Sequence, residues 1–348
     1  MAVRLGIVGC GRVTEARHLP ALRGIPEAEV SALSDVDVAT LESVGERFAV
    51  ARRYSDYREM IESGGVDAVA VCVPPKFHTE IALAALGAGK HLFVEKPLAL
   101  SLDECRLLRE RAAVDGKLKV LVGFNMRWHR LVREAREIIR RGELGEIKLV
   151  RTVFTSGIRR NPAYPEWRRR RESGGGAQFE LGVHHFDLLR FLLASEAREV
   201  SASSASGDET VTVSIRMSDG EQVVCAFSEG TGENHEIEVY GERRWLRLSC
   251  YRADGLELYE AGEYPGAVGV RLRRAAKFFR DMPRMVRQSG KGGDYVASYA
   301  EEWRHFIDSI RNDGAVESTL HDGQRALEIA LAALESTTTK RVIEINAT

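Results

Sequence analysis

The sequence predicts an α/β protein of two domains, the first with a parallel sheet between helices and the second with an antiparallel or mixed sheet. At 348 residues the chain is long for one hydrophobic core, which favours two domains. Up to residue 124, short continuous apolar runs alternate with segments of helical period, as in βαβ units. Beyond it, strands follow one another with few helices between them. We therefore expect the domains to span residues 1–124 and 125–348.

The alternation defines the elements of the first domain. The expected strands are residues 3–8, 30–33, 67–73, 91–94 and 118–124, and the expected helices lie near 12–23, 38–48, 56–63, 77–88 and 101–115. Ser101 stands before the last of these helices and Glu104 follows three residues later, which predicts a capping box.

The second domain opens with an amphipathic helix at 130–145 that a glycine ends. Strands are expected at 146–156, 211–217, 222–228, 235–241 and 244–250, then helices at 298–312 and 322–337 and a short strand at 341–345. The basic segment 271–293 is predicted to be a surface helix that packs its apolar side on the core or on a neighbouring subunit. Contact with a membrane, or with an anionic substrate such as a nucleotide-linked sugar, is the alternative.

Composition excludes several function classes. A net charge of −1 gives no general attraction to nucleic acid or to an anionic membrane, and the apolar runs are too short to span a bilayer. The N-terminus lacks the long apolar region of a secretory signal. Five widely separated cysteines without a C-x-x-C pair indicate reduced thiols in a cytoplasmic protein. They do not indicate a disulfide framework, and we expect no metal site.

A glycine turn stands between the first strand and the first helix. Gly9 permits the tight turn and Gly11 lets the backbone approach a pyrophosphate at a helix N-terminus, while Thr14 departs from the usual glycine or alanine. Asp35 ends the second strand, where a carboxylate accepts hydrogen bonds from an adenosine ribose and repels a 2′-phosphate. NAD is therefore expected, and NADP is disfavoured. Either Asp35 or Asp37 could instead cap the next helix.

Two further segments follow strands of the first domain. Pro74 and His78 lie after the strand at 67–73, at the edge where open α/β sheets bind ligands, so we list both as cofactor-binding candidates. His78 could equally be a helix-start residue. Glu95 and Lys96 end the apolar strand "HLFVE" and reach the same edge, and Pro97 restricts the chain after the lysine.

The segment 173–193 combines three glycines with Glu180, His184 and Asp187. If the segment is helical, their spacing of four and three places them on one face. A histidine can remove a hydroxyl proton near neutral pH and a carboxylate can orient it. Zinc binding would need a further ligand, and no cysteine is near in sequence. The structural alternative is a helix N-terminus with Asp187 near it and His185 in solvent.

Three of these segments together resemble one family. Residues 6–22, 91–100 and 174–192 look like the Gfo/Idh/MocA oxidoreductases, named for glucose–fructose oxidoreductase and inositol dehydrogenase, and the match covers nearly the whole chain. The combination of E-K-P with G-x-H-x-x-D is specific, whereas the glycine turn alone is not. The resemblance implies a Rossmann domain followed by an α+β domain. The open, mostly antiparallel sheet of that second domain mediates oligomers in many members.

The resemblance also implies roles for individual residues. Lys96 would lie beside the nicotinamide and the substrate hydroxyl, His184 would be the acid/base, and the Lys96–Pro97 peptide bond would be cis. Glu95 would hold the cofactor together with the glycine turn, whose residues are Gly9, Gly11, Arg12 and Val13. The residues that fall where relatives line the substrate pocket are Asn125, Arg127, Trp167 and Arg168.

Glu180 departs from the family pattern, because many of these dehydrogenases carry aspartate four residues before the histidine. Glutamate reaches about one methylene further, and a misplacement of ~1 Å can cost on the order of a hundredfold in rate. Glu180 therefore either serves a differently placed substrate or indicates altered chemistry, and we keep it as a catalytic candidate.

The function implied is an NAD-dependent dehydrogenase or reductase of a sugar, nucleotide sugar or cyclitol. Its expected partners are that small molecule and further copies of itself, with no nucleic acid and no membrane. Two alternatives stay open: an NAD-assisted glycosidase of the same family, and a non-catalytic protein that senses NAD or a sugar.

Overall fold

The computed structural model describes residues 1–162, 164–205, 208–288 and 292–346. The chain forms two compact units. Unit 1 comprises Met1–Asn125, Arg170–Gly174 and Tyr299–Leu327, and unit 2 comprises Met126–Arg169, Gly175–Ser298 and Glu328–Thr348.

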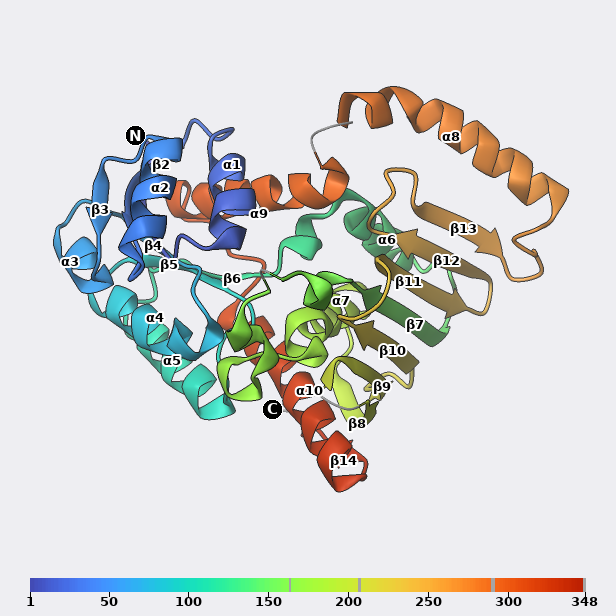
Figure 1. Cartoon of the computed structure of the whole chain (residues 1–348). Coiled ribbons are helices and arrows are strands. Elements are labelled where there is room, and N and C mark those ends of the chain that lie inside the picture. Colours follow the sequence, from blue (N-terminus) through green and yellow to red (C-terminus); the bar gives the residue numbers. More distant parts are fainter. Residues whose placement is uncertain (163, 206–207, 289–291, 347–348) are drawn as a thin grey trace. The chain divides into compact units, whose positions relative to one another are not determined.

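Unit 1 is built on a six-stranded sheet in the order β3-β2-β1-β4-β5-β6, in which every pair of neighbours is parallel. The strands are β1 Val3–Val8, β2 Ala28–Ser34, β3 Arg52–Tyr54, β4 Ala68–Val71, β5 His91–Glu95 and β6 Val120–Gly123 (Figure 1). The strand order reverses between β1 and β4. Sheets of this kind bind dinucleotides outside the carboxyl ends of the strands at such a point.

The helices of unit 1 follow the predicted alternation closely. They are the π-helix η1 Thr14–His18, α1 Leu19–Leu22, α2 Val38–Phe48, α3 Tyr57–Glu62, the 3₁₀ turn η2 Pro75–Phe77, α4 His78–Gly87 and α5 Leu102–Val114. The capping box at α5 is confirmed. The Ser101 hydroxyl accepts a hydrogen bond from the Glu104 amide, and the Glu104 carboxylate accepts one from the Ser101 amide.

Residues from the C-terminal part of the chain complete the core of unit 1. The indole of Trp303 stacks on Phe93 with ring centroids 4.3 Å apart, and Ser318 Oγ donates to the carbonyl oxygen of Val122 at 2.7 Å. The sequence alone assigned residues 299–327 to the second domain. Long-range packing on β5 and β6 instead joins them to the parallel sheet.

Unit 2 contains an eight-stranded sheet in the order β13-β12-β11-β7-β10-β9-β8-β14. The strands are β7 Ile147–Thr155, β8 Ala197–Ser204, β9 Thr210–Met217, β10 Gln222–Ser228, β11 Asn234–Gly241, β12 Arg244–Ser249, β13 Leu256–Glu260 and β14 Ile343–Glu344. Only β7 and β10 pair in parallel within this sheet, so the prediction of a mostly antiparallel sheet is confirmed.

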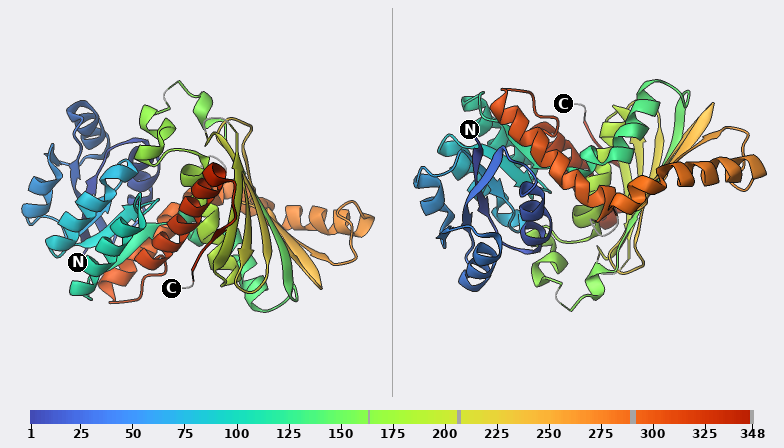
Figure 2. Two further views of the ribbon diagram at one scale, coloured as in Figure 1. Left: turned by 90° about the horizontal axis from the view of Figure 1, so that it is seen from below. Right: turned by 90° about the horizontal axis from the view of Figure 1, so that it is seen from above.

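Helices cover one face of the second sheet, which Figure 2 shows edge-on. The remaining helical segments are η3 Asn125–Trp128, α6 Arg130–Arg140, η4 Ile158–Arg160, η5 Glu166–Arg169, η6 Arg171–Ser173, η7 Gln178–Gly182, α7 Val183–Leu193, α8 Val268–Gln288, α9 Gly293–Arg311 and α10 Leu320–Thr339. The ring of Phe186 in α7 packs edge to face against Phe227 of β10, with centroids 5.5 Å apart. Ser336 Oγ of α10 accepts a hydrogen bond from the Ala202 amide of β8 at 2.9 Å.

Helix α8 accounts for most of the basic segment 271–293, of which residues 289–291 lie outside the described residues. Its attachment is polar, with Arg273 paired to Glu263 at 2.6 Å and Arg274 paired to Glu257. Leu272 and Phe279 are exposed. The predicted packing of the apolar side on the chain's own core is therefore wrong, because ion pairs face the sheet and the large apolar side chains face solvent.

Within the described residues no helix combines the length and the apolar character needed to cross a membrane. All five cysteines are buried free thiols, in agreement with the sequence-based expectation.

Candidate active site

The glycine turn of unit 1 has the geometry that a bound pyrophosphate requires. Gly9 has φ +97°, and a Cβ there would lie 2.4 Å from the carbonyl oxygen of Cys72, so a side chain is excluded. Thr14 is buried and its hydroxyl donates to the carbonyl oxygen of Gly9 at 2.6 Å. This bond explains why threonine stands where glycine or alanine was expected, since its hydroxyl closes the turn.

The other turn residues leave space for a ligand. A Cβ at Gly11 would meet no heavy atom of the described chain within 4 Å. Arg12 is exposed and Val13 half-buried, and the Glu15 amide closes the first helical turn by donating to the Gly11 carbonyl at 3.0 Å. An open glycine at a helix N-terminus fits a phosphate group.

Asp35 lies directly after β2, with its carboxylate fixed against the glycine turn. The Cys10 amide donates to Oδ2 at 2.7 Å and the Asp37 amide to Oδ1 at 2.9 Å. Asp37 is the residue that caps α2, accepting from the Ala39 amide and from the Thr40 hydroxyl. Asp37 is therefore the cap of α2, and the contact of Asp35 with an adenosine ribose stays a prediction, for which its carboxylate keeps further lone pairs.

Pro74 and His78 differ in their exposure. Pro74 lies in the loop after β4 and is half-buried. His78 begins α4 and is fully buried, with Nδ1 2.9 Å from the Pro97 carbonyl and Nε2 2.9 Å from the Val73 carbonyl. Burial lowers its pKa. The His78 ring thus joins the segments after β4 and β5, in keeping with the helix-start role that the sequence left open, and its cofactor contact stays a prediction.

Glu95 and Lys96 follow the buried part of β5 at the same sheet edge as Gly9 and Asp35. The Glu95 carboxylate is nearly buried; Oε1 lies 2.9 Å from His18 Nε2, and Oε2 accepts the Lys96 amide at 3.1 Å. Lys96 is half-buried, and the Lys96–Pro97 peptide bond is cis, as the family resemblance implied. The strand therefore brings an acid and an ammonium to the edge where a dinucleotide would bind.

The acid/base candidates lie in unit 2. Glu180 belongs to the π-helix η7 and His184 to the first turn of α7. Arg168 Nε lies 3.6 Å from Glu180 Oε1, and the Arg168 guanidinium lies 5.2 Å from the Trp167 ring centre. Four of the predicted residues thus belong to one unit, and Arg168 lies close to two of the others.

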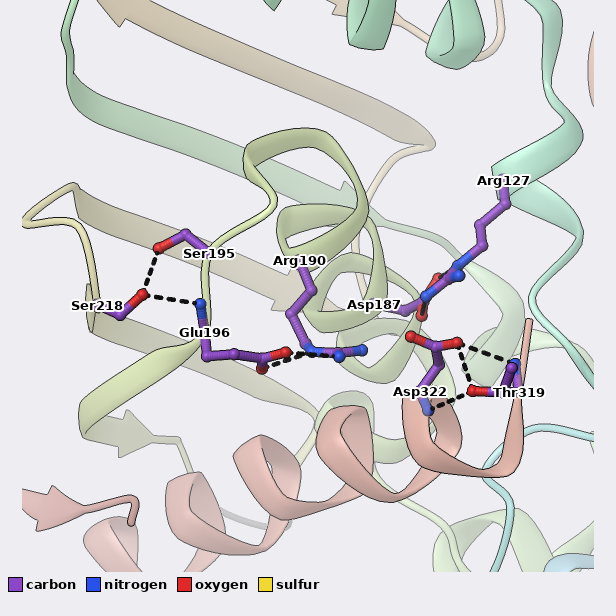
Figure 3. Close-up of polar contacts among 8 residues, drawn as sticks. All are labelled: Arg127, Asp187, Arg190, Ser195, Glu196, Ser218, Thr319 and Asp322. Atoms are coloured by element: carbon purple, nitrogen blue, oxygen red, sulfur yellow. Dashed lines mark hydrogen bonds and ion pairs between the residues drawn. The ribbon is translucent and has the colours of Figure 1, made fainter. Parts of the chain in front are cut away.

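Asp187 does not join this group. Figure 3 shows its carboxylate against the Arg127 guanidinium: Nε donates to Oδ2 at 2.7 Å and Nη2 to Oδ1 at 2.5 Å. Both side chains are buried, and Arg127 also lies over the Phe191 ring at 5.1 Å. Two nitrogens of the Arg127 guanidinium therefore serve an internal ion pair, and the expected place of Arg127 in the substrate pocket stays a prediction.

Asn125, a predicted pocket residue, and His185, next to His184, are also buried. Asn125 follows β6 at the start of η3 with its side chain enclosed. His185, which the structural alternative placed in solvent, is fully buried, and its ring stacks on Phe154 at 5.4 Å. Burial lowers the pKa of His185 to about 3, so this ring stays neutral and His184 remains the candidate base.

Sequence reasoning missed Tyr164 and Glu229. The Tyr164 hydroxyl donates to Glu229 Oε1 at 2.7 Å, while Oε2 has no hydrogen-bond partner among the described residues. Burial raises the pKa of Glu229 to about 7, and the charge of Glu180 adds to the rise. The available signal was an acid at the end of the apolar strand "QVVCAFSE", the same pattern that marked Glu95.

The raised pKa of Glu229 predicts a specific pH dependence of stability. A carboxyl whose pKa is about 7 in the native state and 4.5 when unfolded binds its proton more tightly in the native state. The free energy of unfolding should therefore fall by roughly 3 kcal/mol from this group as the pH rises from 5 to 8. In urea unfolding experiments, the free energy of unfolding of Glu229→Gln should fall less between these two pH values, because the variant lacks the carboxyl group. An identical pH dependence in the variant and the wild type would rule out a shifted Glu229.

Comparisons with known proteins agree with this geometry. Residues 3–124 match the family model described as "Oxidoreductase family, NAD-binding Rossmann fold", and residues 132–247 match the "GFO/IDH/MocA C-terminal domain". A protein of Thermotoga maritima named myo-inositol 2-dehydrogenase is 30% identical, over 99% of this chain and 98% of its own.

Solved structures share the fold over the whole chain. A levoglucosan dehydrogenase in complex with NADH has a TM-score of 0.85 at 20% identity and covers 100% of both chains. The WlbA dehydrogenase of Bordetella pertussis, solved with NADH and UDP-GlcNAcA, has a TM-score of 0.83 at 22% identity and covers 100% of this chain and 99% of its own.

Proposed function

This chain belongs to the Gfo/Idh/MocA family of NAD-binding oxidoreductases, and we propose that it transfers hydride between NAD and a secondary alcohol or ketone of a sugar, nucleotide sugar or cyclitol. The observation that supports this proposal most is the ending of β5. Glu95 and Lys96 lie at the sheet edge that also carries the Gly9 turn and Asp35. A lysine at this edge has the charge needed beside an alkoxide.

We assign each catalytic candidate a role in that reaction. Bound NAD supplies the hydride acceptor. The Lys96 ammonium stabilises negative charge on the substrate oxygen, and the His184 imidazole takes the hydroxyl proton. Glu180 orients that histidine, and its contact with Arg168 supports the longer side chain.

For NAD itself, we propose that Gly9, Gly11, Arg12 and Val13 enclose the pyrophosphate and that Asp35 accepts the ribose hydroxyls. Two features support this assignment: the open space at Gly11, and the amide bonds that orient the Asp35 carboxylate. A 2′-phosphate would meet that carboxylate, which disfavours NADP.

For the substrate, Trp167 and Arg168 offer an aromatic face and a guanidinium, the kind of groups that bind a polyhydroxylated ring. Asn125 stays a candidate from family resemblance alone. The names of similar proteins define which compounds to test: myo-inositol, levoglucosan and UDP-GlcNAcA. We also propose a homo-oligomer in the cytoplasm, supported by exposed Leu149 and Val224 on adjacent strands and by the free thiols.

The test is an assay of the whole chain with NAD and a panel of cyclitols, sugars and nucleotide sugars, following NADH at 340 nm and identifying the products. With at least one compound, we expect one NADH to form for each ketone produced. The reaction should be slower when NADP replaces NAD. Glycoside cleavage without net NADH would support the glycosidase alternative. Tight NAD binding without any turnover would support the sensor alternative.

A further inference from the structure

His18, at the end of η1, is a fully buried histidine to which the proposed reaction gives no role. Three aromatic rings of unit 1 enclose its imidazole edge to face, with centroid distances of 5.4 Å to Phe93, 5.6 Å to Tyr299 and 5.8 Å to Trp303. These three ring contacts restrict the orientation of the imidazole.

Both ring nitrogens of His18 have partners from distant parts of the chain. Nε2 lies 2.9 Å from Glu95 Oε1, and the Trp303 indole N–H donates to Nδ1 at 3.1 Å. An indole N–H can only donate, so Nδ1 must present its lone pair. The proton of the neutral imidazole then lies on Nε2, where it donates to the Glu95 carboxylate.

The surroundings of His18 act on its protonation state in opposite directions. Burial disfavours the imidazolium, but Cys72 and Glu95 favour it and raise the pKa of His18. A second proton on Nδ1 would point at the indole N–H of Trp303, so the indole opposes it. The bond from the indole N–H therefore favours the neutral ring, against the effects of Cys72 and Glu95.

The carboxylate that receives the His18 proton is held at both oxygens, because the Lys96 amide donates to Oε2 at 3.1 Å. Burial would raise the pKa of Glu95, but the bond from His18 and the charge of Lys96 outweigh it and keep this pKa low. Glu95 is therefore ionised, and its position is defined by donors from η1 and from the next residue.

We propose that Trp303 and His18 form a donor relay that positions the Glu95 carboxylate at the NAD edge, so that a tryptophan from the C-terminal part of the chain sets the geometry of the nucleotide site. The relay rests on the proposed function only in that Glu95 and Lys96 serve NAD and substrate. His18 and Trp303 are positioning residues, since neither is placed to touch a ligand.

The first test is the tautomer of His18, read by ¹⁵N NMR on the whole chain without cofactor. The relay predicts one proton, on Nε2, in the wild type at neutral pH. Trp303→Phe should give an imidazolium at the same pH. The matched control is Phe306→Leu, since Phe306 packs in the same cluster, 5.9 Å from Trp303 and 6.1 Å from Phe93, but donates no hydrogen bond. An imidazolium or an Nδ1–H tautomer in the wild type would refute the relay.

The second test is NAD affinity, measured by titration calorimetry. His18→Leu should weaken NAD binding roughly tenfold, the value of one hydrogen bond to a charged group. Trp303→Phe keeps the Nε2 proton of His18 but loses the indole bond that orients the ring, so it should weaken binding by less. Phe306→Leu should bind as the wild type, and His18→Gln, whose amide can donate to Glu95, should recover most of the loss. Equal weakening by Trp303→Phe and Phe306→Leu would show packing alone and overturn the proposal. Neither test needs turnover, so a failure of the proposed oxidation would be seen separately.

Discussion

Lys96→Ala should lower turnover of the best polyol by about a hundred- to a thousandfold, the usual cost of removing a group that stabilises charge in a transition state. The side chain follows β5 at the edge that carries the glycine turn and Asp35. Because its ammonium acts on the developing alkoxide, the loss should appear in kcat, while the dissociation constant of NAD changes little. Steady-state kinetics and NAD titration of the same preparation measure both.

Two conservative variants separate charge from packing at this position. Lys96→Met keeps most of the stem and removes the charge, so it should be as inactive as Lys96→Ala. Lys96→Arg keeps the charge but spreads it over a planar group, and should retain partial activity. Full turnover by Lys96→Ala would contradict the mechanism.

Asp187→Ala should destabilise the second unit by about 3–5 kcal/mol, because it removes the carboxylate to which two nitrogens of the buried Arg127 guanidinium donate. The effect should appear in the urea midpoint and in the melting temperature. A double change to Arg127→Met with Asp187→Leu removes both charges together and should cost far less.

Figure 3 provides the matched control for this prediction, the pair of Arg190 with Glu196. Its distances are also short, 2.7 Å for both bonds, but the Glu196 side chain is 38% exposed. Glu196→Ala should therefore cost clearly less than Asp187→Ala, since water reaches the place of the Glu196 carboxylate beside the buried Arg190. If the two alanine variants were equally stable, burial would not be the reason for the strength of the Arg127–Asp187 pair.

Local patterns predicted much of the fold. The strand at 222–228 and the helix at 38–48 have the predicted bounds, because continuous apolar runs and helical spacing leave little choice of structure. The same patterns brought Asp35, Glu95 and Lys96 to strand ends, where a parallel sheet binds its ligand. The spacing of Glu180, His184 and Asp187 made His184 a candidate base, and the family resemblance supplied the cis bond, which no periodicity could.

Features that depend on distant partners escaped prediction. Trp303 and His18 are 285 residues apart, and Arg127 and Asp187 are 60 apart, so no local spacing indicates their contacts. Strand β8 has a mixed polar sequence, and its pairing with β9 decides its conformation. His78 and Arg127, both predicted to lie near a ligand, share one feature that the sequence did not indicate: each side chain has an internal hydrogen-bond partner.

The central claim is that this chain moves hydride from the carbon of a secondary alcohol to NAD. The most direct measurement uses a panel substrate deuterated at the reacting carbon, with mass spectrometry of the NADH that forms. We predict one deuterium per NADH, and a slower rate than with the undeuterated compound. NADH without deuterium, or product without any reduced cofactor, would contradict the account.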